Sequence, residues 1–119
     1  PVGGSSFGVR AQRLTCRNVT PGQTVTIPQP TGSWDCEAAG LTVSPGDSVR
    51  QTLAGRPDAA DIGGTAIGVS QPRVRCQNQT SGQTVQFEPS GTLTWSCRDQ
   101  GLVFTHTDRV TQLFLGVAD

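Results

Sequence analysis

The chain contains one stretch of sequence twice: Cys16-Arg17-Asn18-Val19-Thr20-Pro21-Gly22-Gln23-Thr24-Val25 returns as Cys76-Gln77-Asn78-Gln79-Thr80-Ser81-Gly82-Gln83-Thr84-Val85. The correspondence continues with a single inserted residue near Gly91, so that Trp34-Asp35-Cys36 matches Trp95-Ser96-Cys97. Self-similarity of this kind is typical of two copies of one structural unit. We therefore place one unit at residues 1–58, a short join at residues 59–62 and a second unit at residues 63–119.

Apolar residues alternate with polar ones within each copy. Leu14 and Cys16 share one face of a predicted strand, and Val49 and Leu53 share one face of another. This period of two is typical of antiparallel strands that are buried on one side. The Pro-Gly pairs of the first copy predict tight turns. Together these patterns predict an all-β fold of two tandem antiparallel repeats, sandwich-like, with about five or six short strands in each.

The four cysteines form two equivalent pairs, which predicts one disulfide in each copy, Cys16–Cys36 and Cys76–Cys97. Other connectivities stay open from the sequence alone. A metal site is disfavoured because no Cys-x-x-Cys motif occurs and His106 is the only histidine. A bridge closing a loop of about 20 residues stabilises a small fold by about 3 kcal/mol. Each tryptophan lies two residues before a cysteine, so we expect its ring to pack on the disulfide in the core.

Composition narrows the class of protein. The 119 residues have a formal net charge of zero, and only 15% of them are charged. A nucleic-acid-binding chain is usually basic, so we expect no nucleic-acid partner. No apolar run is long enough to span a membrane. Disulfides favour an oxidising compartment, so we expect a protein that is secreted, extracellular or on the cell surface. No stretch has the pattern of a signal peptide, and we expect the sequence to be a mature form.

No motif in the sequence indicates catalysis. His106 falls in a predicted turn, and Asp47 and Asp108 each precede a strand, where we expect them to brace turns. We therefore expect no catalytic residue, no metal ligand and no cofactor, and we predict that the protein is not an enzyme.

Differences between the copies suggest an interface. Leu113 and Leu115 stand where the first copy has Thr52 and Ala54, which makes the last strand of the second copy apolar on both faces. The segment 2–9 corresponds to a strand that follows directly from the preceding copy, and it has no such preceding copy itself. It could pair with a neighbouring chain, head to tail. The alternatives are an N-terminal strand docked in its own domain, or a frayed end. The sequence thus predicts a structural or adhesive subunit of an extracellular filament, a homopolymer with interface residues Val2, Phe7, Val9, Leu113 and Leu115.

The alternative is a lectin-like module with two glycan sites, one in each copy. The candidate ligands are polar residues that both copies share: Asn18, Gln23, Asp47, Asn78, Gln83 and Asp108. Asn18 and Asn78 also begin N-glycosylation sequons, although a strand end followed by a turn explains the same pattern.

Arginines stand on the outward face of two equivalent predicted strands: Arg13, Arg17, Arg73 and Arg75. A sulfated or acidic glycan could bind there. We instead expect these arginines to pair with Asp35 and Glu37 across strands.

Overall fold

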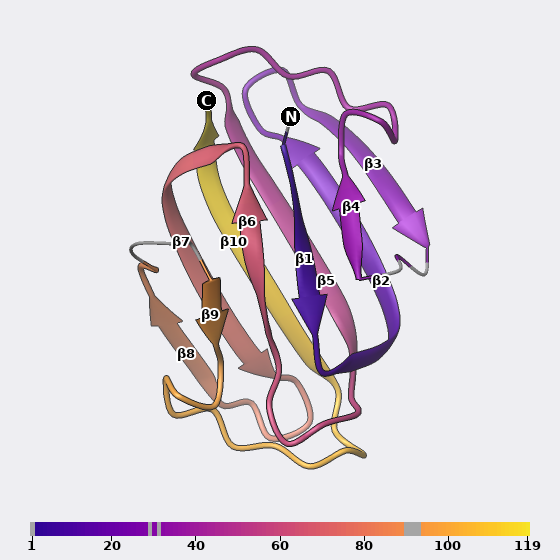
Figure 1. The fold of residues 1–119 in the computed structure, drawn as a ribbon, viewed down its shortest axis with the longest axis vertical. Coiled ribbons are helices and arrows are strands. Elements are labelled where there is room, and N and C mark those ends of the chain that lie inside the picture. The colour runs from indigo at the N-terminus through magenta and orange to yellow at the C-terminus, as the bar shows by residue number, and fades with distance from the viewer. Residues whose placement is uncertain (1, 29, 31, 90–93) are drawn as a thin grey trace.

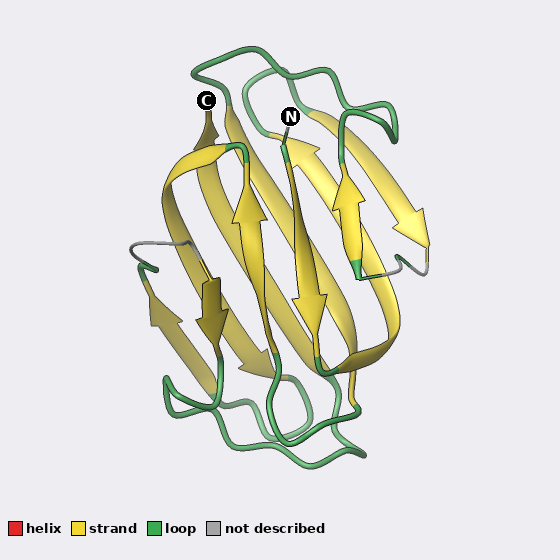
Figure 2. Cartoon of the chain, in the orientation of Figure 1, coloured by secondary structure: helices red, strands yellow, loops and turns green. Residues whose placement is uncertain are grey.

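A computed structural model describes residues 2–28, 30, 32–89 and 94–119, and within these ranges the chain forms ten strands and no helix (Figures 1 and 2). The first half contains β1 (Gly3–Phe7), β2 (Val9–Asn18), β3 (Gln23–Pro28), β4 (Ser33–Asp35) and β5 (Ser48–Pro57). The second half contains β6 (Gly63–Ile67), β7 (Val69–Asn78), β8 (Thr84–Phe87), β9 (Thr94–Ser96) and β10 (Val110–Ala118). The prediction of an all-β fold is confirmed.

The strands form two stacked antiparallel sheets. The smaller sheet has the order β4-β1-β6-β9, and the larger sheet has the order β3-β2-β5-β10-β7-β8. Every strand of the first half has a counterpart five strands later with corresponding neighbours. Each sheet contains strands of both halves, because β1 pairs with β6 and β5 pairs with β10 (Figure 1). The two halves therefore build one sandwich with a shared core.

The chain passes from the smaller to the larger sheet at the start of each half. Gly8 makes this bend between β1 and β2 with a φ of 75°, at a place where a side chain would collide with the carbonyl of Asp61. Soon afterwards the pairing of β2 with β5 shifts register between Arg10 and Arg13. Ala11, inside that bulge, has a φ of 53° and leaves the regular ladder. Gln71 has a φ of 52° at the corresponding position of β7, so the bulge belongs to the fold itself.

Both predicted disulfides are present, Cys16–Cys36 and Cys76–Cys97, and all four cysteines are buried. The tryptophans are buried too, as their strand positions predict. Phe114 of β10 lies between them, with its ring centroid 6.0 Å from that of Trp34 and 4.9 Å from that of Trp95. One aromatic ring of the second half therefore joins the cores of both.

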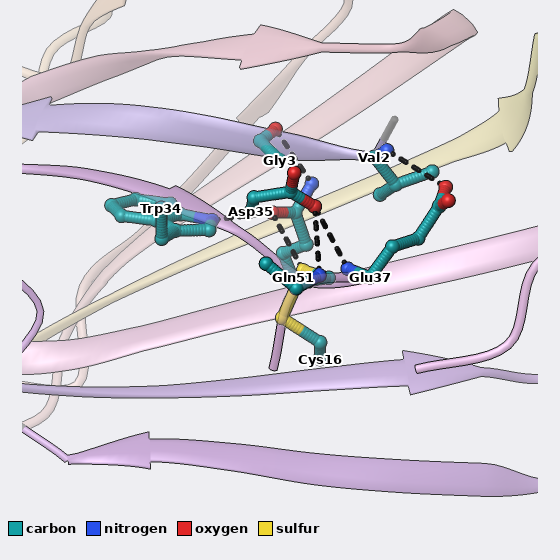
Figure 3. The surroundings of a disulfide bond; sticks show 9 residues. Val2, Gly3, Cys16, Trp34, Asp35, Glu37 and Gln51 are labelled. Atoms are coloured by element: carbon teal, nitrogen blue, oxygen red, sulfur yellow. Dashed lines mark hydrogen bonds between the residues drawn. A yellow bond between two sulfur atoms is a disulfide. The ribbon is translucent and has the colours of Figure 1, made fainter. Parts of the chain in front are cut away.

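Buried hydrogen bonds join the two sheets beside each disulfide, and Figure 3 shows those beside Cys16–Cys36. Trp34 Nε1 on β4 donates to Gln51 Oε1 on β5 at 2.6 Å, and Gln51 Nε2 donates to the Gly3 carbonyl on β1 at 3.2 Å. Trp95 Nε1 makes the corresponding bond to Gln112 Oε1 at 2.8 Å. Gly4 lets the Trp34 ring lie close beneath β1, because a Cβ there would stand 3.2 Å from the ring.

The prediction that segment 2–9 pairs with a neighbouring chain does not fit this structure. β1 already has a strand on each side within its own chain, β4 on one edge and β6 on the other. Val2 and Val9 are buried in the core, at 2% and 7% exposure. The segment is an internal strand of the smaller sheet, so it has no free edge for strand addition.

Replacement of Gln51 by leucine tests the tie between the sheets. We expect Gln51→Leu to lower the free energy of unfolding, because it removes two buried hydrogen bonds and leaves Trp34 Nε1 and the Gly3 carbonyl without this partner. Each buried polar group left without a partner costs about 1–3 kcal/mol. Urea unfolding followed by tryptophan fluorescence measures the loss. An unchanged free energy of unfolding would contradict the role given to Gln51 in joining the two sheets.

Candidate functional site

The outer face of the larger sheet carries rows of aligned side chains that cross all six strands. In one row the residues stand, from β3 to β8, in the order Thr24, Arg17, Arg50, Leu115, Arg73 and Glu88. The next row reads Thr26, Thr15, Thr52, Leu113, Arg75 and Gln86. Seven of the nine arginines project from this side, which we name the arginine face: Arg10, Arg13, Arg17, Arg50, Arg56, Arg73 and Arg75.

Among the described residues only one carboxylate is aligned with these strands on the arginine face, that of Glu88, which directly follows β8. Within the described ranges the sole ion pair joins Arg73 Nε to Glu88 Oε1 at 3.3 Å, and both side chains remain largely exposed. The predicted pairs with Asp35 and Glu37 are wrong, because β4 lies in the other sheet. Asp35 Oδ1 instead accepts hydrogen bonds from two backbone amides of the following turn, and Glu37 accepts one from the Val2 amide.

Like charges stand directly opposite each other on neighbouring strands of this face. Arg17 on β2 faces Arg50 on β5, and Arg17 uses its guanidinium to donate to Thr24 Oγ1 at 2.9 Å. Cross-strand pairs of like charge are destabilising. Arg10 and Arg56 are also opposite each other, but both donate to backbone carbonyls, those of His106 and Thr107. In the pair Arg17/Arg50 the observed acceptor is the Thr24 hydroxyl, which binds Arg17. The two guanidinium groups therefore concentrate positive charge at one place.

Leu113 and Leu115 lie in the middle of the arginine face and are half-buried. Leu113 stands between Thr52 and Arg75, and Leu115 stands between Arg50 and Arg73. Phe7, 43% exposed, lies on β1 of the other sheet. The five predicted interface residues therefore do not form one surface: two are on the arginine face, one is on the opposite side of the sandwich and two are in the core.

The residues proposed as glycan ligands meet in each half, but they bind their own chain. Asn18 Nδ2 donates to Asp47 Oδ2 at 2.8 Å and to the Thr42 carbonyl at 2.9 Å. Gln23 accepts from the Thr42 amide and donates to the Gly40 carbonyl. The second half repeats these contacts with Asn78, Gln83 and Asp108 around an open groove. This polar lock holds three loops together, and its geometry supports bracing rather than ligand binding.

The N-glycosylation reading does not fit the folded chain. Asn18 and Asn78 are buried, at 0% and 1% exposure, and each Nδ2 donates two hydrogen bonds inside the protein. A glycan on that nitrogen would replace one of its two N–H donors, would break at least one of these bonds and would have no room at so buried a position. The alternative explanation holds: each Asn ends a strand, and its Oδ1 accepts the amide of the threonine two residues later.

Asp47 and Asp108 brace turns, as predicted. The hydrogen bond from Asn18, followed by that from the Ser44 amide, lowers the pKa of Asp47 below its ordinary value. At Asp108 the Thr105 amide and then Asn78 lower the pKa in the same way. Both carboxylates thus accept hydrogen bonds as anions, and neither is held in a protonated state that general acid catalysis would use.

The described part of the chain contains no group of three or more His, Cys, Asp or Glu side chains placed to hold a metal ion. It also contains no helix long and apolar enough to cross a membrane. Comparisons of the chain with protein families, with curated proteins and with solved structures find no match.

Three residues of the arginine face, Arg10, Arg50 and Arg56, were missed by the sequence reasoning. Arg50 and Arg56 alternate outward along β5, and this alternation was visible in the sequence, whereas Arg10 lies before the bulge of β2. That β5 lies beside β2, so that its arginines join Arg13 and Arg17, depends on the strand order. The arrangement as a whole offers a broad cationic surface with an apolar centre.

The polar lock predicts acid sensitivity. Because the folded pKa of Asp47 and of Asp108 is depressed, the stability they contribute is present above the unfolded pKa and is lost as pH falls through the folded pKa. We expect the double variant Asp47→Asn, Asp108→Asn to be less stable than the native chain at pH 7, with the difference shrinking steadily below about pH 4. Urea midpoints between about pH 7 and pH 2 measure this. A difference that stays constant with pH would contradict it.

Proposed function

We propose that this protein is a non-enzymatic adhesive protein of the cell exterior that binds an anionic polysaccharide on the arginine face. The observation that carries the proposal is the segregation of charge: seven arginines and one carboxylate project from one side of a chain whose net charge is zero. The two disulfides are consistent with an oxidising compartment. Positive charge gathered on one side attracts polyanions even when the whole molecule is neutral.

Arginine suits this ligand chemically. Its planar guanidinium presents five N–H donors that match sulfate and carboxylate oxygens in pairs, and it is less strongly hydrated than an ammonium group. The rows place such groups about 4.8 Å apart between neighbouring strands and about 7 Å apart along one strand. A chain polymer with repeated anionic groups could contact several of them at once, and multiple weak contacts add to a stable complex.

A polysaccharide is favoured over nucleic acid on two grounds. Single-stranded nucleic acids are usually held by aromatic side chains that stack on the bases, and the strands project no aromatic residue on the arginine face. Duplex DNA is usually read by a helix or ribbon inserted in a groove, whereas this surface is a sheet face (Figure 2).

Self-assembly through this face is less well supported. Two copies placed with their arginine faces together would bring guanidinium groups against guanidinium groups, and like charges at an interface are unfavourable. Leu113 and Leu115 are better placed to contact the apolar faces of sugar rings between the charged groups, as pockets for ligands combine apolar surface with a few polar contacts.

The first test replaces two arginines by the residues that the second half has at the corresponding positions. Arg17→Gln with Arg50→Thr gives the first half the residues found at the corresponding positions of the second half, Gln77 and Thr111. We expect the affinity for dextran sulfate to fall about tenfold, or about 1.4 kcal/mol. We also expect a shallower dependence of affinity on salt, because fewer counterions are released. Glu88→Gln frees Arg73 and is expected to tighten binding. Surface plasmon resonance measures both effects.

Three controls separate the alternatives. Unmodified dextran should not bind, and Arg98→Gln, which removes one positive charge outside the arginine face, should bind dextran sulfate as the native chain does. Duplex DNA of equal charge density should bind more weakly than dextran sulfate. No binding of dextran sulfate, heparin or hyaluronan by the native chain would refute the proposal, and tighter binding of DNA would reassign the face to nucleic acid.

A further inference from the structure

A shallow pocket of about 250 Å³ opens at one end of the arginine face. Three arginines line it: Arg13 from β2, Arg56 from the end of β5, and Arg109 immediately before β10. Gln79 adds an amide, and two alanines and a glycine make up the remaining walls. The lining contains no carboxylate. Three cations therefore line one hollow without a neutralising group in its walls, and this favours an anion as the ligand.

The walls are built by both halves and held in place by the backbone. Gln79 N donates to the Arg109 carbonyl at 2.7 Å, and Arg109 N donates to Thr80 Oγ1 at 3.0 Å. Arg56 is oriented by its bond to the Thr107 carbonyl at 3.2 Å, which leaves other N–H groups of the guanidinium to donate elsewhere. Small side chains at Ala11 and Ala54 leave the space open. Donors fixed in advance cost less conformational entropy when a ligand binds.

The corresponding positions of the two halves supply an internal comparison. The positions that correspond to Arg56 and Arg109 are Val117 and Ser48, and the position that corresponds to Gln79 is Val19. Arg73 corresponds to Arg13, but it pairs with Glu88. The backbone is the same there, because Val19 N donates to the Ser48 carbonyl and Ser48 N donates to Thr20 Oγ1. The shared backbone therefore does not explain why arginines stand at one of these two sites and not at the other. Their presence needs an explanation other than the fold.

We infer that the pocket formed by Arg13, Arg56 and Arg109 is an oxyanion site that takes one sulfate ester group of the polysaccharide; this inference rests on the proposed function. Three guanidinium groups from three directions match the three terminal oxygens of a sulfate ester better than the two oxygens of a carboxylate. Arg13 and Arg17 lie four residues apart on β2, about 14 Å in an extended strand. The pocket would hold one group of the ligand while the pair Arg17/Arg50 holds another.

The test uses a small ligand, so that contacts elsewhere on the face do not contribute. Amide chemical shifts of the full chain are followed by NMR during titration with a monosaccharide that carries one sulfate ester, and in parallel with glucuronate. We expect saturable shifts at Ala11, Ala54, Gly55 and Gln79 with the sulfate, and at least threefold weaker binding of glucuronate. We expect Arg109→Ser and Arg56→Val to weaken sulfate binding at least tenfold.

Both substitutions use residues that the corresponding positions already contain, so we expect the variants to fold, and their midpoints of thermal unfolding check this. The control Arg98→Gln should bind as the native chain does. Amide chemical-shift changes spread evenly over the arginine face would refute the proposed oxyanion site. Equal affinity of the native chain and of Arg109→Ser for the sulfated monosaccharide would refute it as well.

Dextran sulfate separates this inference from the proposed function. Tight polymer binding without saturable shifts at the pocket would refute the pocket alone. Saturable sulfate binding at the pocket without polymer binding would refute the proposed function and leave a site for a single oxyanion.

Discussion

The structure depends on the buried tie between the two sheets beside each disulfide. A tryptophan of the smaller sheet donates to a glutamine of the larger one, and a disulfide joins the same two layers a few residues away. Gln51 Oε1 lies 3.5 Å from Cys36 Sγ, so the polar group and the bridge share one location. Buried polar groups specify a packing when they are fully paired. Here they fix which faces of β2, β5, β7 and β10 point inward, and hence which side chains form the outer surface.

That fixed outer surface carries an electrostatic cost. Arg17 stands opposite Arg50, and only Arg73 of the arginine face has an ion pair among the described residues. Repulsion of this kind weakens a sheet by a few tenths of a kcal/mol up to about 1 kcal/mol for each pair. Arginines spread among the nine carboxylates would remove it. Their separation is readily explained if the positive side serves an external anion, since proteins tolerate unfavourable local choices mainly at functional sites.

Much of the architecture could be predicted from the sequence, and the site could not. Alternation and the equivalent cysteines predicted the strands, the buried tryptophans and both bridges, because these depend on local period and spacing. The partners of Arg13 and Arg17 depend on which strands become neighbours. Asp35 seemed to lie beside them when the first copy was considered alone, but its strand belongs to the other sheet. Segment 2–9 was misassigned for the same reason, since its second neighbour, β6, comes from the other copy.

Comparison of corresponding positions in the two halves separates what the fold needs from what is present at one end of the sheet only. Both retain the bulge, the Asn–Asp lock and the Trp–Gln bond, so these features belong to the fold. Arg56 and Arg109 have only valine and serine as counterparts, on a backbone with the same hydrogen bonds. A difference in side chains on an unchanged backbone alters the surface without altering the packing. Such a pair of sites is informative because one member acts as a reference for the other: the shared backbone bonds belong to the fold, and the proposed oxyanion pocket rests on the arginines that only one of the two sites has.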